Sequence, residues 1–471
     1  MSQNQGYADI VLGLQYGDEG KARVVDMIAK DYDVIARFNG GANAGHTVEN
    51  EHGKIALNQV PSGIFYPDKQ LYTGSGCVID MPKLAAEIAK IEERDISLTG
   101  RYHISSQVSL VQPHHLYLDA KMGGKIGTTK KGIGPCYADK AFRMDEGRLT
   151  NIRIGDVAED ADKFFGKMKD NLLHAIKLHG LEVTDPDKDI AEQRAAFEKV
   201  KQYVQPDTLW IQKQAENGGR ILFEGAQSAM LDVTKGSVPY VTSSNTIAAA
   251  AYFGGDLSPN FHRKTIGVAK ALMSRVGFGP FTSEIGAPES EEYCMAANPD
   301  GSPTYGRSVE EQLNAEELIG SDDDLEVSKA LRIRSHEYGT VSTRPRRVGA
   351  FDLIQLSYTM KMNGVTELFI TKCDLLREFH DTKKQSIPLV TAYTLDDKTI
   401  DYVPGSTDTY ARVKPVGEEL PGFPEDLTAM RTPEELPEAM HNFIHEVEKR
   451  NHCKVIGIGV GPGRDQYVTF Q

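Results

Sequence analysis

The stretch from residue 10 to residue 47 constrains the fold most strongly, because a short apolar run followed by a glycine-rich turn occurs in it twice. The first unit has an apolar run at 10–12, a turn at 17–21 and apolar residues at helical spacing from 24 to 28. A strand, a glycine-rich turn and a helix together present backbone N–H groups and a helix N-terminus to a phosphate. The second unit is a strand candidate at 34–38 that runs into a turn at 40–47. The pattern predicts an α/β fold with a phosphate site on these turns.

The first turn is not a Walker A loop, which needs Gly, four residues and then Gly-Lys-Ser/Thr. Gln15 stands where the first glycine belongs, and Ala22 follows Lys21 where a hydroxyl residue belongs. The turn instead carries an acid, Asp18, and the second turn carries His46. Glycines that only shape tight turns would explain either turn alone. Two such turns with ionisable side chains favour a site that performs chemistry.

Composition and charge exclude several classes of protein. The 471-residue chain has 53 Lys and Arg against 67 Asp and Glu, and the formal charge of −14 argues against non-specific binding to nucleic acid or a membrane surface. Five cysteines are scattered without a CxxC pair, which indicates reduced thiols and no cysteine metal site. No apolar segment is typical of a secretory signal or long enough to span a membrane. We therefore expect a cytoplasmic protein.

Further short apolar runs alternate with helical patterns, which predicts a mostly parallel central sheet. The additional strand candidates lie at 71–79, 220–226, 265–272, 368–370 and 455–459. Two segments differ from this pattern. Residues 159–219 are highly charged with helical periodicity and predict a peripheral helical subregion. Residues 286–327 are acidic and rich in Gly, Pro and Ser, and we favour a solvated excursion, helical in part, that carries no chemistry.

Two loops have side chains suited to anionic ligands. Residues 123–135 combine two hydroxyls, the cations of Lys130 and Lys131 and flexible glycines, which is typical of a loop that wraps a phosphate, although a basic surface loop fits as well. Arg344, Arg346 and Arg347 flank Pro345 and suit a bidentate grip on carboxylates or phosphates. Before both loops in the chain, His114 and His115 are adjacent on a probable helix. Neighbouring helical residues do not share a face, so we do not expect a metal site there.

A strand that ends in Thr371-Lys372-Cys373-Asp374 has the [NT]-K-x-D pattern by which GTP-binding proteins recognise guanine. The carboxylate accepts hydrogen bonds from N1–H and the 2-amino group, a pair that adenine lacks, while the lysine stem packs on the ring. A four-residue match alone is a weak signal. It fits two classes of protein, an enzyme that uses GTP and a regulatory GTP-binding protein.

The order of motifs along the chain resembles that of the adenylosuccinate synthetase family, from about residue 10 to residue 470. The motifs are QYGDEGK (15–21), GGANAGHT (40–47), VPSGIF (60–65), GTTKKGIGP (127–135), FEGAQ (223–227), PYVTSSNT (239–246), RVGFGPF (275–281), TRPRR (343–347), TKCD (371–374) and GPGR (461–464). Each motif is modest alone, but their combination is highly specific. The resemblance implies one α/β domain over residues 1–471 with a nucleotide site like that of P-loop GTPases.

The family joins L-aspartate to C6 of IMP with GTP and Mg²⁺, so the resemblance implies a ligase of AMP synthesis that forms a C–N bond. GTP first phosphorylates O6 of IMP, and the aspartate amine then displaces that phosphate. The family acts as a homodimer, so the resemblance implies one here, with small-molecule substrates and no nucleic-acid or membrane partner.

The resemblance also implies a role for individual residues. Asp18 would be the base at N1 of IMP, with Lys21 and His46 assisting catalysis. Asp18 and the carbonyl of Gly45 would hold Mg²⁺. The GTP site would contain Gly17, Glu19, Gly20, Lys21, Lys372, Asp374, Gly461 and Pro462. The IMP site would contain Asn43, Thr129, Gln227, Thr242 and Arg344, with Arg143 reaching the site of the neighbouring subunit. The aspartate site would contain Ser342, Arg344 and Arg346.

Several positions depart from the family pattern. Tyr16 stands where the family usually has Trp, Ala22 and Ser228 where it has Gly, and Val341-Ser342-Thr343 where it has Thr-Thr-Gly. The acidic segment 286–327 lengthens the chain before the arginines. These changes lie near the purine and amino-acid sites, so a relative that acts on another purine nucleotide such as dGMP stays open. Asp18, which that phage group commonly lacks, favours IMP.

Overall fold

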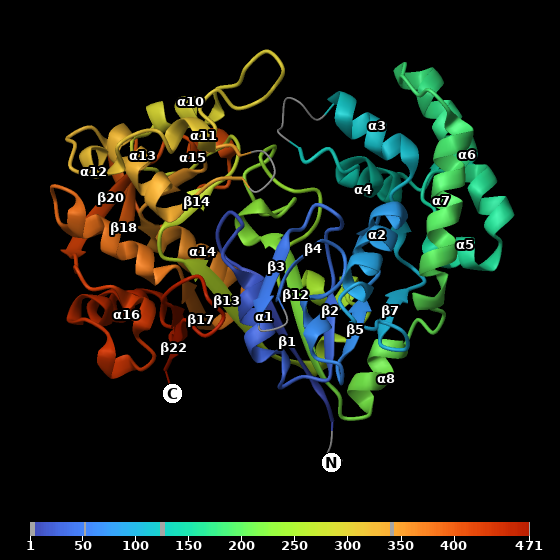
Figure 1. Cartoon of the computed structure of the whole chain (residues 1–471), viewed down its shortest axis with the longest axis horizontal. Helices are drawn as coiled ribbons and strands as arrows, with labels where there is room; N and C mark the ends of the chain where they lie inside the picture. Colours follow the sequence, from blue (N-terminus) through green and yellow to red (C-terminus); the bar gives the residue numbers. More distant parts are fainter. Residues whose placement is uncertain (1–4, 51–52, 123–127, 340–342, 471) are drawn as a thin grey trace.

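The computed structural model describes residues 5–50, 53–122, 128–339 and 343–470. Its centre is a ten-stranded sheet in the order β11-β7-β5-β2-β12-β1-β13-β17-β21-β22 (Figure 1). All neighbours on this path are parallel except β21 and β22. The strands are β1 (Tyr7–Gly13), β2 (Val34–Arg37), β5 (Gln70–Thr73), β7 (Tyr102–Ser105), β11 (Val204–Gln205), β12 (Arg220–Ser228), β13 (His262–Lys270), β17 (Val365–Thr371), β21 (Lys454–Gly459) and β22 (Tyr467–Thr469).

The sheet is buried on both faces, which explains why its strands are nearly continuous apolar runs. In β1, Ile10 and Leu12 enter one hydrophobic cluster while Val11 enters the other. The predicted strands are confirmed with one difference. The expected run at 71–79 is divided into β5 and the short β6 (Val78–Ile79) by a turn. The predicted mostly parallel α/β fold is therefore correct.

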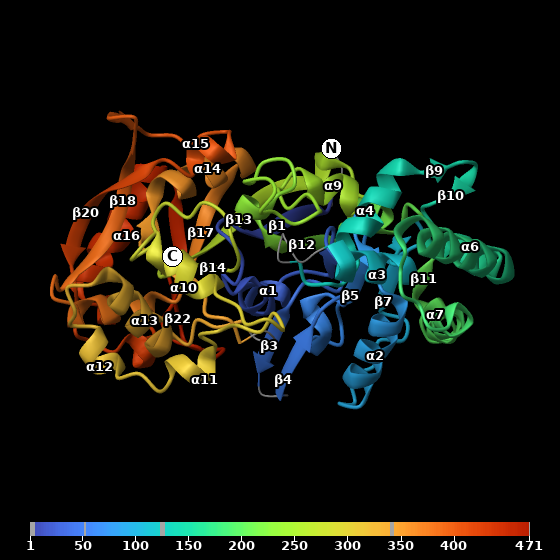
Figure 2. The same cartoon turned by 90° about the horizontal axis from the view of Figure 1, so that it is seen from above.

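The helices lie on the two faces and at the two ends of the sheet (Figures 1 and 2). They are α1 (Lys21–Ala29), α2 (Met81–Glu92), α3 (Pro113–Met122), α4 (Ile133–Phe142), α5 (Ile154–Glu159), α6 (Ala161–His179), α7 (Pro186–Val200), α8 (Trp210–Glu216), α9 (Ala250–Gly254), α10 (Glu289–Met295), α11 (Arg307–Glu310), α12 (Ala315–Leu318), α13 (Asp324–Ser335), α14 (Leu353–Asn363), α15 (Thr407–Tyr410) and α16 (Glu438–Asn451). Among the described residues, none of these helices is both long and apolar enough to cross a membrane.

Smaller sheets and 3-10 helices complete the architecture. The remaining strands are β3 (His46–Asn50), β4 (Gly53–Leu57), β8 (Ser109–Leu110), β9 (Met144–Asp145), β10 (Arg148–Leu149), β14 (Met273–Arg275), β15 (Arg347–Gly349), β16 (Phe351–Asp352), β18 (Ser386–Leu395), β19 (Lys398–Ile400) and β20 (Lys414–Pro421). The 3-10 helices are η1 (Ser62–Phe65), η3 (Lys201–Tyr203), η4 (Ala229–Leu231), η5 (Pro259–Phe261), η6 (Cys373–Asp381), η7 (Leu427–Ala429) and η8 (Pro433–Glu435).

The two unusual segments lie at opposite ends of the sheet. The charged segment 159–219 forms α6, α7 and α8, on the green side of Figure 1, as its periodicity predicted. The acidic segment 286–327 forms α10, α11, α12 and the start of α13 at the other end. Its predicted helical part is present, but the expectation of a solvated excursion is wrong in part. Ser290, Cys294 and Glu310 are buried within it.

Parallel strands end at the same edge of a sheet, and ligands of open α/β sheets bind at that edge. The turn after β1, the turn after β2, the loop after β12 and the loops after β17 and β21 all begin there. These loops carry most of the residues that the sequence singled out. The fold therefore gathers the predicted motifs at one edge.

Candidate active site

The turn between β1 and α1 is strongly bent and is held from within. Gly17, Asp18 and Gly20 all have positive φ, at 96°, 58° and 78°. The Glu19 carboxylate is completely buried and accepts the backbone N–H groups of Gly17 at 2.8 Å and Gln15 at 3.2 Å. Because the Glu19 carboxylate is engaged by these two N–H groups inside the turn, only the backbone of Glu19 is left to contact a phosphate of GTP.

Lys21 is fixed by the same carboxylate. Its Nζ lies 2.7 Å from Glu19 Oε2, and the side chain is 6% exposed. Burial alone would raise the pKa of Glu19, but the charges of nearby lysines, above all Lys21, lower it to about 2. Ser228, one of the departures from the family pattern, donates its hydroxyl to Glu19 at 2.6 Å. The substitution of Gly by Ser therefore adds a hydrogen bond beneath the turn.

An ion-pair chain joins the first turn to two other predicted sites. Arg346 Nη2 lies 2.8 Å from Asp18 Oδ2, and Arg346 Nη1 lies 2.8 Å from Glu337 Oε2. The other oxygen of Glu337 pairs with Lys372, and Ser274 donates its hydroxyl to Glu337 at 2.9 Å. Burial opposes ionisation of Glu337, but the surrounding cations hold its pKa far below the usual range. Arg346 and Lys372 thus both pair with the buried Glu337 carboxylate, and Arg346 also pairs with Asp18.

Lys270, at the end of β13, supports the turn from the other side. Its Nζ donates to the carbonyl of Gly17 and to Ser274 Oγ, both at 2.7 Å. Burial lowers the pKa of this lysine to about 8. Because the ammonium binds the Gly17 carbonyl directly, Lys270 fixes the backbone next to Asp18.

The second turn presents a histidine held by a buried acid. His46 Nδ1 lies 2.5 Å from Glu224 Oε1, and the two side chains are 7% and 0% exposed. Glu224 also accepts the backbone N–H of Ser62 at 2.9 Å. Burial raises the pKa of Glu224, but the neighbouring His46 and other partners lower it to about 2. The ionised carboxylate therefore holds the orientation of the imidazole.

Two of the residues predicted to bind IMP, Asn43 and Gln227, meet beside Gly40. A Cβ at Gly40 would lie 3.1 Å from Gln227 Oε1 and 3.6 Å from Asn43 Oδ1, so the two amides meet there. Gln227 has positive φ, and neither polar atom of its buried amide has a hydrogen-bond partner among the described residues. Thr242 follows Gln227 in the chain, and its N–H donates to the carbonyl of Leu231 at 2.8 Å. An unpaired buried amide is costly, which indicates a ligand that satisfies it.

The basic loop is held between α3 and α4. Asp119 on α3 accepts the Thr128 hydroxyl at 2.7 Å and the Gly132 N–H at 2.8 Å. Residues 123–127 of the predicted phosphate loop lie outside the described residues. Thr129 is exposed, and Arg143, at the end of α4, is exposed with φ of 68°.

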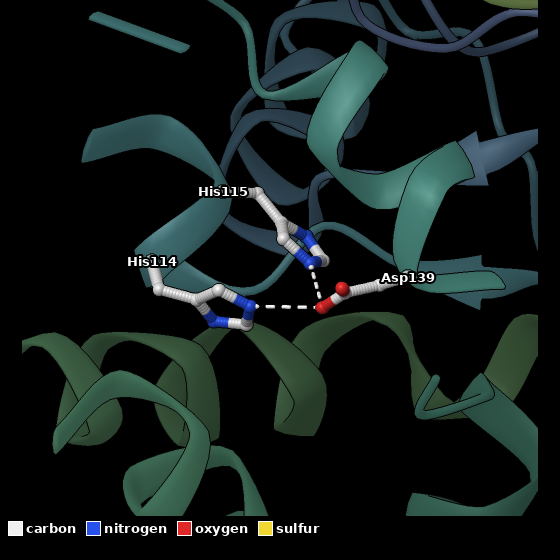
Figure 3. Close-up of side chains that lie close together, drawn as sticks. All are labelled: His114, His115 and Asp139. Atoms are coloured by element: carbon white, nitrogen blue, oxygen red, sulfur yellow. Dashed lines mark hydrogen bonds and ion pairs between the residues drawn. The ribbon is translucent and has the colours of Figure 1, made fainter. Parts of the chain in front are cut away.

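His114, His115 and Asp139 form a separate cluster (Figure 3). Both Nε2 atoms lie 3.0 Å from the same oxygen of Asp139, so the expectation that the two histidines face apart is wrong. The first turn of α3 allows both to reach α4. The Gln112 N–H donates to His115 Nδ1 at 3.0 Å, which leaves the proton of this neutral ring on Nε2. A metal would need that atom unprotonated, so the cluster is a hydrogen-bonded link between α3 and α4.

The predicted guanine site lies where β17 and β21 end. Asp374 is the second residue of η6, and burial raises its pKa to about 6. Lys372 has φ of 58° and pairs with Glu337. Arg23 on α1 donates to the carbonyl of Gly461 at 2.5 Å, next to Pro462. The GPGR loop is thus fixed against α1, beside the helix that follows the first turn.

The arginine loop contacts the acidic segment. Arg344 Nη1 donates to the carbonyls of Cys294 and Ala296, both at 3.2 Å. Arg346 is directed to Asp18, as described above. Ser342 lies outside the described residues, so its predicted role stays a prediction. The two arginines of the predicted aspartate site are therefore held by different parts of the molecule.

The predicted Mg²⁺ ligands suit a hard cation, which prefers oxygen donors. The Asp18 side chain is 46% exposed, although it pairs with Arg346. Gly45 is exposed, and nothing lies within 4 Å of the position a Cβ would take there. The carboxylate and the carbonyl are thus both accessible.

Three residues of the site were not singled out from the sequence: Glu224, Lys270 and Glu337. Glu224 and Lys270 carry a usable signal, because a charged residue within or at the end of a buried strand requires a partner. Glu337 lies in no strand, and only the folded structure shows the cations around it.

Comparison with known proteins gives a consistent result. A family model described as adenylosuccinate synthetase matches residues 10–468. The adenylosuccinate synthetase 2 of Cupriavidus pinatubonensis is 42% identical over 471 residues, covering 99% of this chain and 98% of that protein.

Two solved structures are also similar. Fully ligated adenylosuccinate synthetase from Plasmodium falciparum has a TM-score of 0.83 at 29% identity, covering 99% of this chain and 100% of that one. The succinoaminodeoxyadenylate synthetase of cyanophage S-2L, bound to dGMP and dATP, has a TM-score of 0.58 at 18% identity, covering 99% and 95%. This second likeness shows a shared fold only.

Proposed function

Because the chain belongs to the adenylosuccinate synthetase family, we propose which of its residues carry out each step of the family's reaction. The protein is a ligase that joins L-aspartate to C6 of IMP with hydrolysis of GTP, giving adenylosuccinate, GDP and phosphate in AMP synthesis. The observation that carries the assignment of residues is the junction of Asp18, Arg346, Glu337 and Lys372 at the carboxyl edge of the sheet.

In the first step, Asp18 takes the proton from N1 of IMP. The electron pair released makes O6 nucleophilic, O6 attacks the γ-phosphorus of GTP, and GDP leaves. Hypoxanthine oxygen is a poor leaving group until it becomes part of a phosphate. The exposed side of the Asp18 carboxylate and its tie to Arg346 support this role.

Negative charge accumulates on the phosphoryl group during transfer, so cations and donors must surround it. Lys21 supplies a positive charge, and His46, oriented by Glu224, donates a hydrogen bond to the phosphoryl group or to O6. Gly17, Gly20 and the backbone of Glu19 form the bend that faces the phosphates. Asp18 and the Gly45 carbonyl would hold Mg²⁺, which when bound neutralises charge on phosphate oxygens.

In the second step, the amine of aspartate attacks C6, the C6–O bond breaks, phosphate leaves and the nitrogen loses a proton. Arg344, Arg346 and Ser342 bind the aspartate carboxylates. The amides of Asn43 and Gln227, with Thr129, Thr242 and Arg344, bind IMP. The unpaired amide of Gln227 supports this part of the assignment.

The nucleotide that supplies the phosphoryl group is selected by Asp374, which accepts N1–H and the 2-amino group of guanine. Lys372 packs on the ring, with Gly461 and Pro462 beside it. The clamp of Arg23 on the GPGR loop supports a preformed base site.

We place Arg143 in the active site of a second subunit, which makes the enzyme a homodimer. Arg143 is exposed, and its neighbours Phe142 and Met144 are 58% and 56% exposed, an apolar pair suited to an interface. The test mixes inactive Asp18→Asn with Arg143→Leu protein. Recovery of activity in the mixture requires sites shared between subunits, whereas no recovery argues against the role of Arg143.

A reducing compartment suits the chain, because its five cysteines are all free. We therefore assign it to the cytoplasm. Non-reducing electrophoresis of protein isolated under alkylation tests this: disulfide-bonded species would argue against it.

The function is tested with purified protein, GTP, Mg²⁺, aspartate and either IMP or dGMP, following product by absorbance and mass. Adenylosuccinate from IMP is expected. Adduct from dGMP alone would contradict the substrate assignment, and no adduct from either would contradict the ligase function.

A further inference from the structure

The acidic segment 286–327 packs directly against the arginine loop that begins at Thr343. The N–H of Arg307 donates to the carbonyl of Thr343 at 3.0 Å. A Cβ at Gly306 would lie 3.4 Å from Thr343 Oγ1, so the backbone of the segment also closes on the side chain. Two carbonyls of the same segment accept the Arg344 guanidinium. Two consecutive residues of the loop are therefore held by one segment.

Thr343 has a backbone conformation that needs such support. Its φ is 53°, a left-handed conformation that is rare for a β-branched residue and common for glycine. Its N–H bonds to the Gly339 carbonyl at 2.9 Å, and the Gly339 N–H bonds to the Arg344 carbonyl at 2.8 Å. The Arg307 N–H satisfies the remaining backbone group of Thr343. The hydrogen bond from the segment thus stabilises a strained residue directly before Arg344.

The segment is itself firmly anchored, so it can hold the loop. Glu310 on α11 pairs with Arg332 on α13 at 2.9 Å, and both side chains are 0% exposed. Tyr293 and Tyr305 stack with ring centroids 4.1 Å apart. The pair of Glu310 and Arg332 thus joins α11 to α13, and α10, α11 and α13 lie on the same side of the molecule in Figure 2.

We infer that the acidic segment is a positioning element of the amino-acid site: it fixes Thr343 and the Arg344 guanidinium, and so sets where the carboxylate of aspartate binds. The inference rests on the proposed role of Arg344 in binding aspartate. It assigns to the segment a share in recognition of the dicarboxylate substrate, through its contacts with Thr343 and Arg344.

The Arg307 N–H is removed by Arg307→Pro. Arg307 is the first residue of α11, where proline is tolerated, and Gly306 has φ of −70° and ψ of 171°, which a following proline accepts. The matched control is Arg307→Ala, which keeps the N–H but loses the ion pair with Glu311. A third variant adds Thr343→Gly to Arg307→Pro, because glycine adopts positive φ without strain.

Loss of one supporting hydrogen bond predicts a KM for aspartate about threefold to tenfold higher in Arg307→Pro than in Arg307→Ala. The KM for GTP should agree within about twofold, and Thr343→Gly should restore part of the affinity for aspartate. Equal KM values for aspartate in the proline and alanine variants would overturn the inference. An equal change in the KM values for aspartate, GTP and IMP, together with a lower melting temperature, would also overturn it, because that result indicates a structural role only.

Arg344→Gln separates this inference from the function on which it rests. A raised KM for aspartate in Arg344→Gln without any effect of Arg307→Pro refutes the positioning role alone. An unchanged KM for aspartate in Arg344→Gln refutes the role of Arg344 itself, and the inference with it.

Discussion

The guanidinium of Arg346 bridges Asp18 and Glu337, at 2.8 Å from each carboxylate. A residue of the proposed aspartate site is thereby bonded to the proposed base for IMP. Through Glu337 the same arginine is joined to Lys372 of the proposed guanine site. This chain of ion pairs therefore links the proposed aspartate, IMP and guanine sites.

Arg346→Gln should lower kcat/KM for aspartate by about 100-fold, because it leaves buried Glu337 without one of its cations and Asp18 without its partner. Arg346→Lys keeps the charge but lacks the planar guanidinium whose two terminal nitrogens contact the two carboxylates, so it should recover only a small part of the activity. The control is Arg412→Gln, which breaks an exposed pair with Asp396 and should have almost no effect. Steady-state kinetics measure kcat/KM for aspartate in each variant. A value for Arg346→Gln within threefold of that of the unmodified protein would refute the functional role of the Arg346 bridge.

Recognition of guanine should weaken in acid. Burial raises the pKa of Asp374 to about 6, and only the ionised form accepts the two guanine N–H groups. As pH falls through 6 the carboxyl gains a proton, so the KM for GTP should rise about tenfold from pH 7 to pH 5. The control is Asp374→Asn. With this variant the triphosphate of GTP still gains protons as pH falls, but the carboxyl at position 374 is absent. An identical pH dependence in both proteins would remove Asp374 from the guanine site.

His46 and Glu224 should act as one unit. Glu224→Gln keeps the size of the side chain but loses the charge that orients the imidazole, and kcat should fall about 10-fold to 100-fold. Adding Glu224→Gln to His46→Asn should cause little further loss, because residues that act together are not additive. Because Glu224 also accepts the Ser62 N–H, the melting temperature of each variant shows whether loss of activity comes from a destabilised fold. Fully multiplicative losses in the double variant would contradict the coupling.

The buried pair of Glu310 and Arg332 should be essential to the packing of the acidic segment. Arg332→Met leaves a buried carboxylate without its cation and should lower the free energy of unfolding by about 3–5 kcal/mol. Replacing both residues, Arg332→Met with Glu310→Leu, should restore most of this loss. Chemical denaturation measures both values. A loss below about 1 kcal/mol in the single variant would show that the pair does not hold the segment.

The sequence predicted the sheet well, because parallel strands buried on both faces are apolar runs that stand out against glycine turns. The position of Asp18, Lys372 and Asp374 at strand ends followed from the same pattern. Residues at the ends of parallel strands must meet at one edge, so local sequence was sufficient to bring their loops together.

Long-range electrostatic partners could not be predicted in this way. Glu337 lies 35 residues from Lys372 in the chain and meets it only in the folded structure. The prediction of a solvated excursion at 286–327 is wrong in part for a similar reason. Its composition is that of a solvated loop, while Glu310 finds its cation only in the folded structure and the contacts with the arginine loop are made by backbone groups. The histidine pair was misjudged because both side chains converge on a residue of another helix.

In the proposed reaction, O6 of IMP takes the phosphoryl group of GTP before aspartate replaces it. IMP labelled with ¹⁸O at O6, incubated with the protein, GTP, Mg²⁺ and aspartate, tests this order when the released phosphate is analysed by mass. We expect one ¹⁸O in the phosphate for each adenylosuccinate formed, and neither product with folded Asp18→Asn protein. Unlabelled phosphate, or phosphate release without adenylosuccinate, would contradict it.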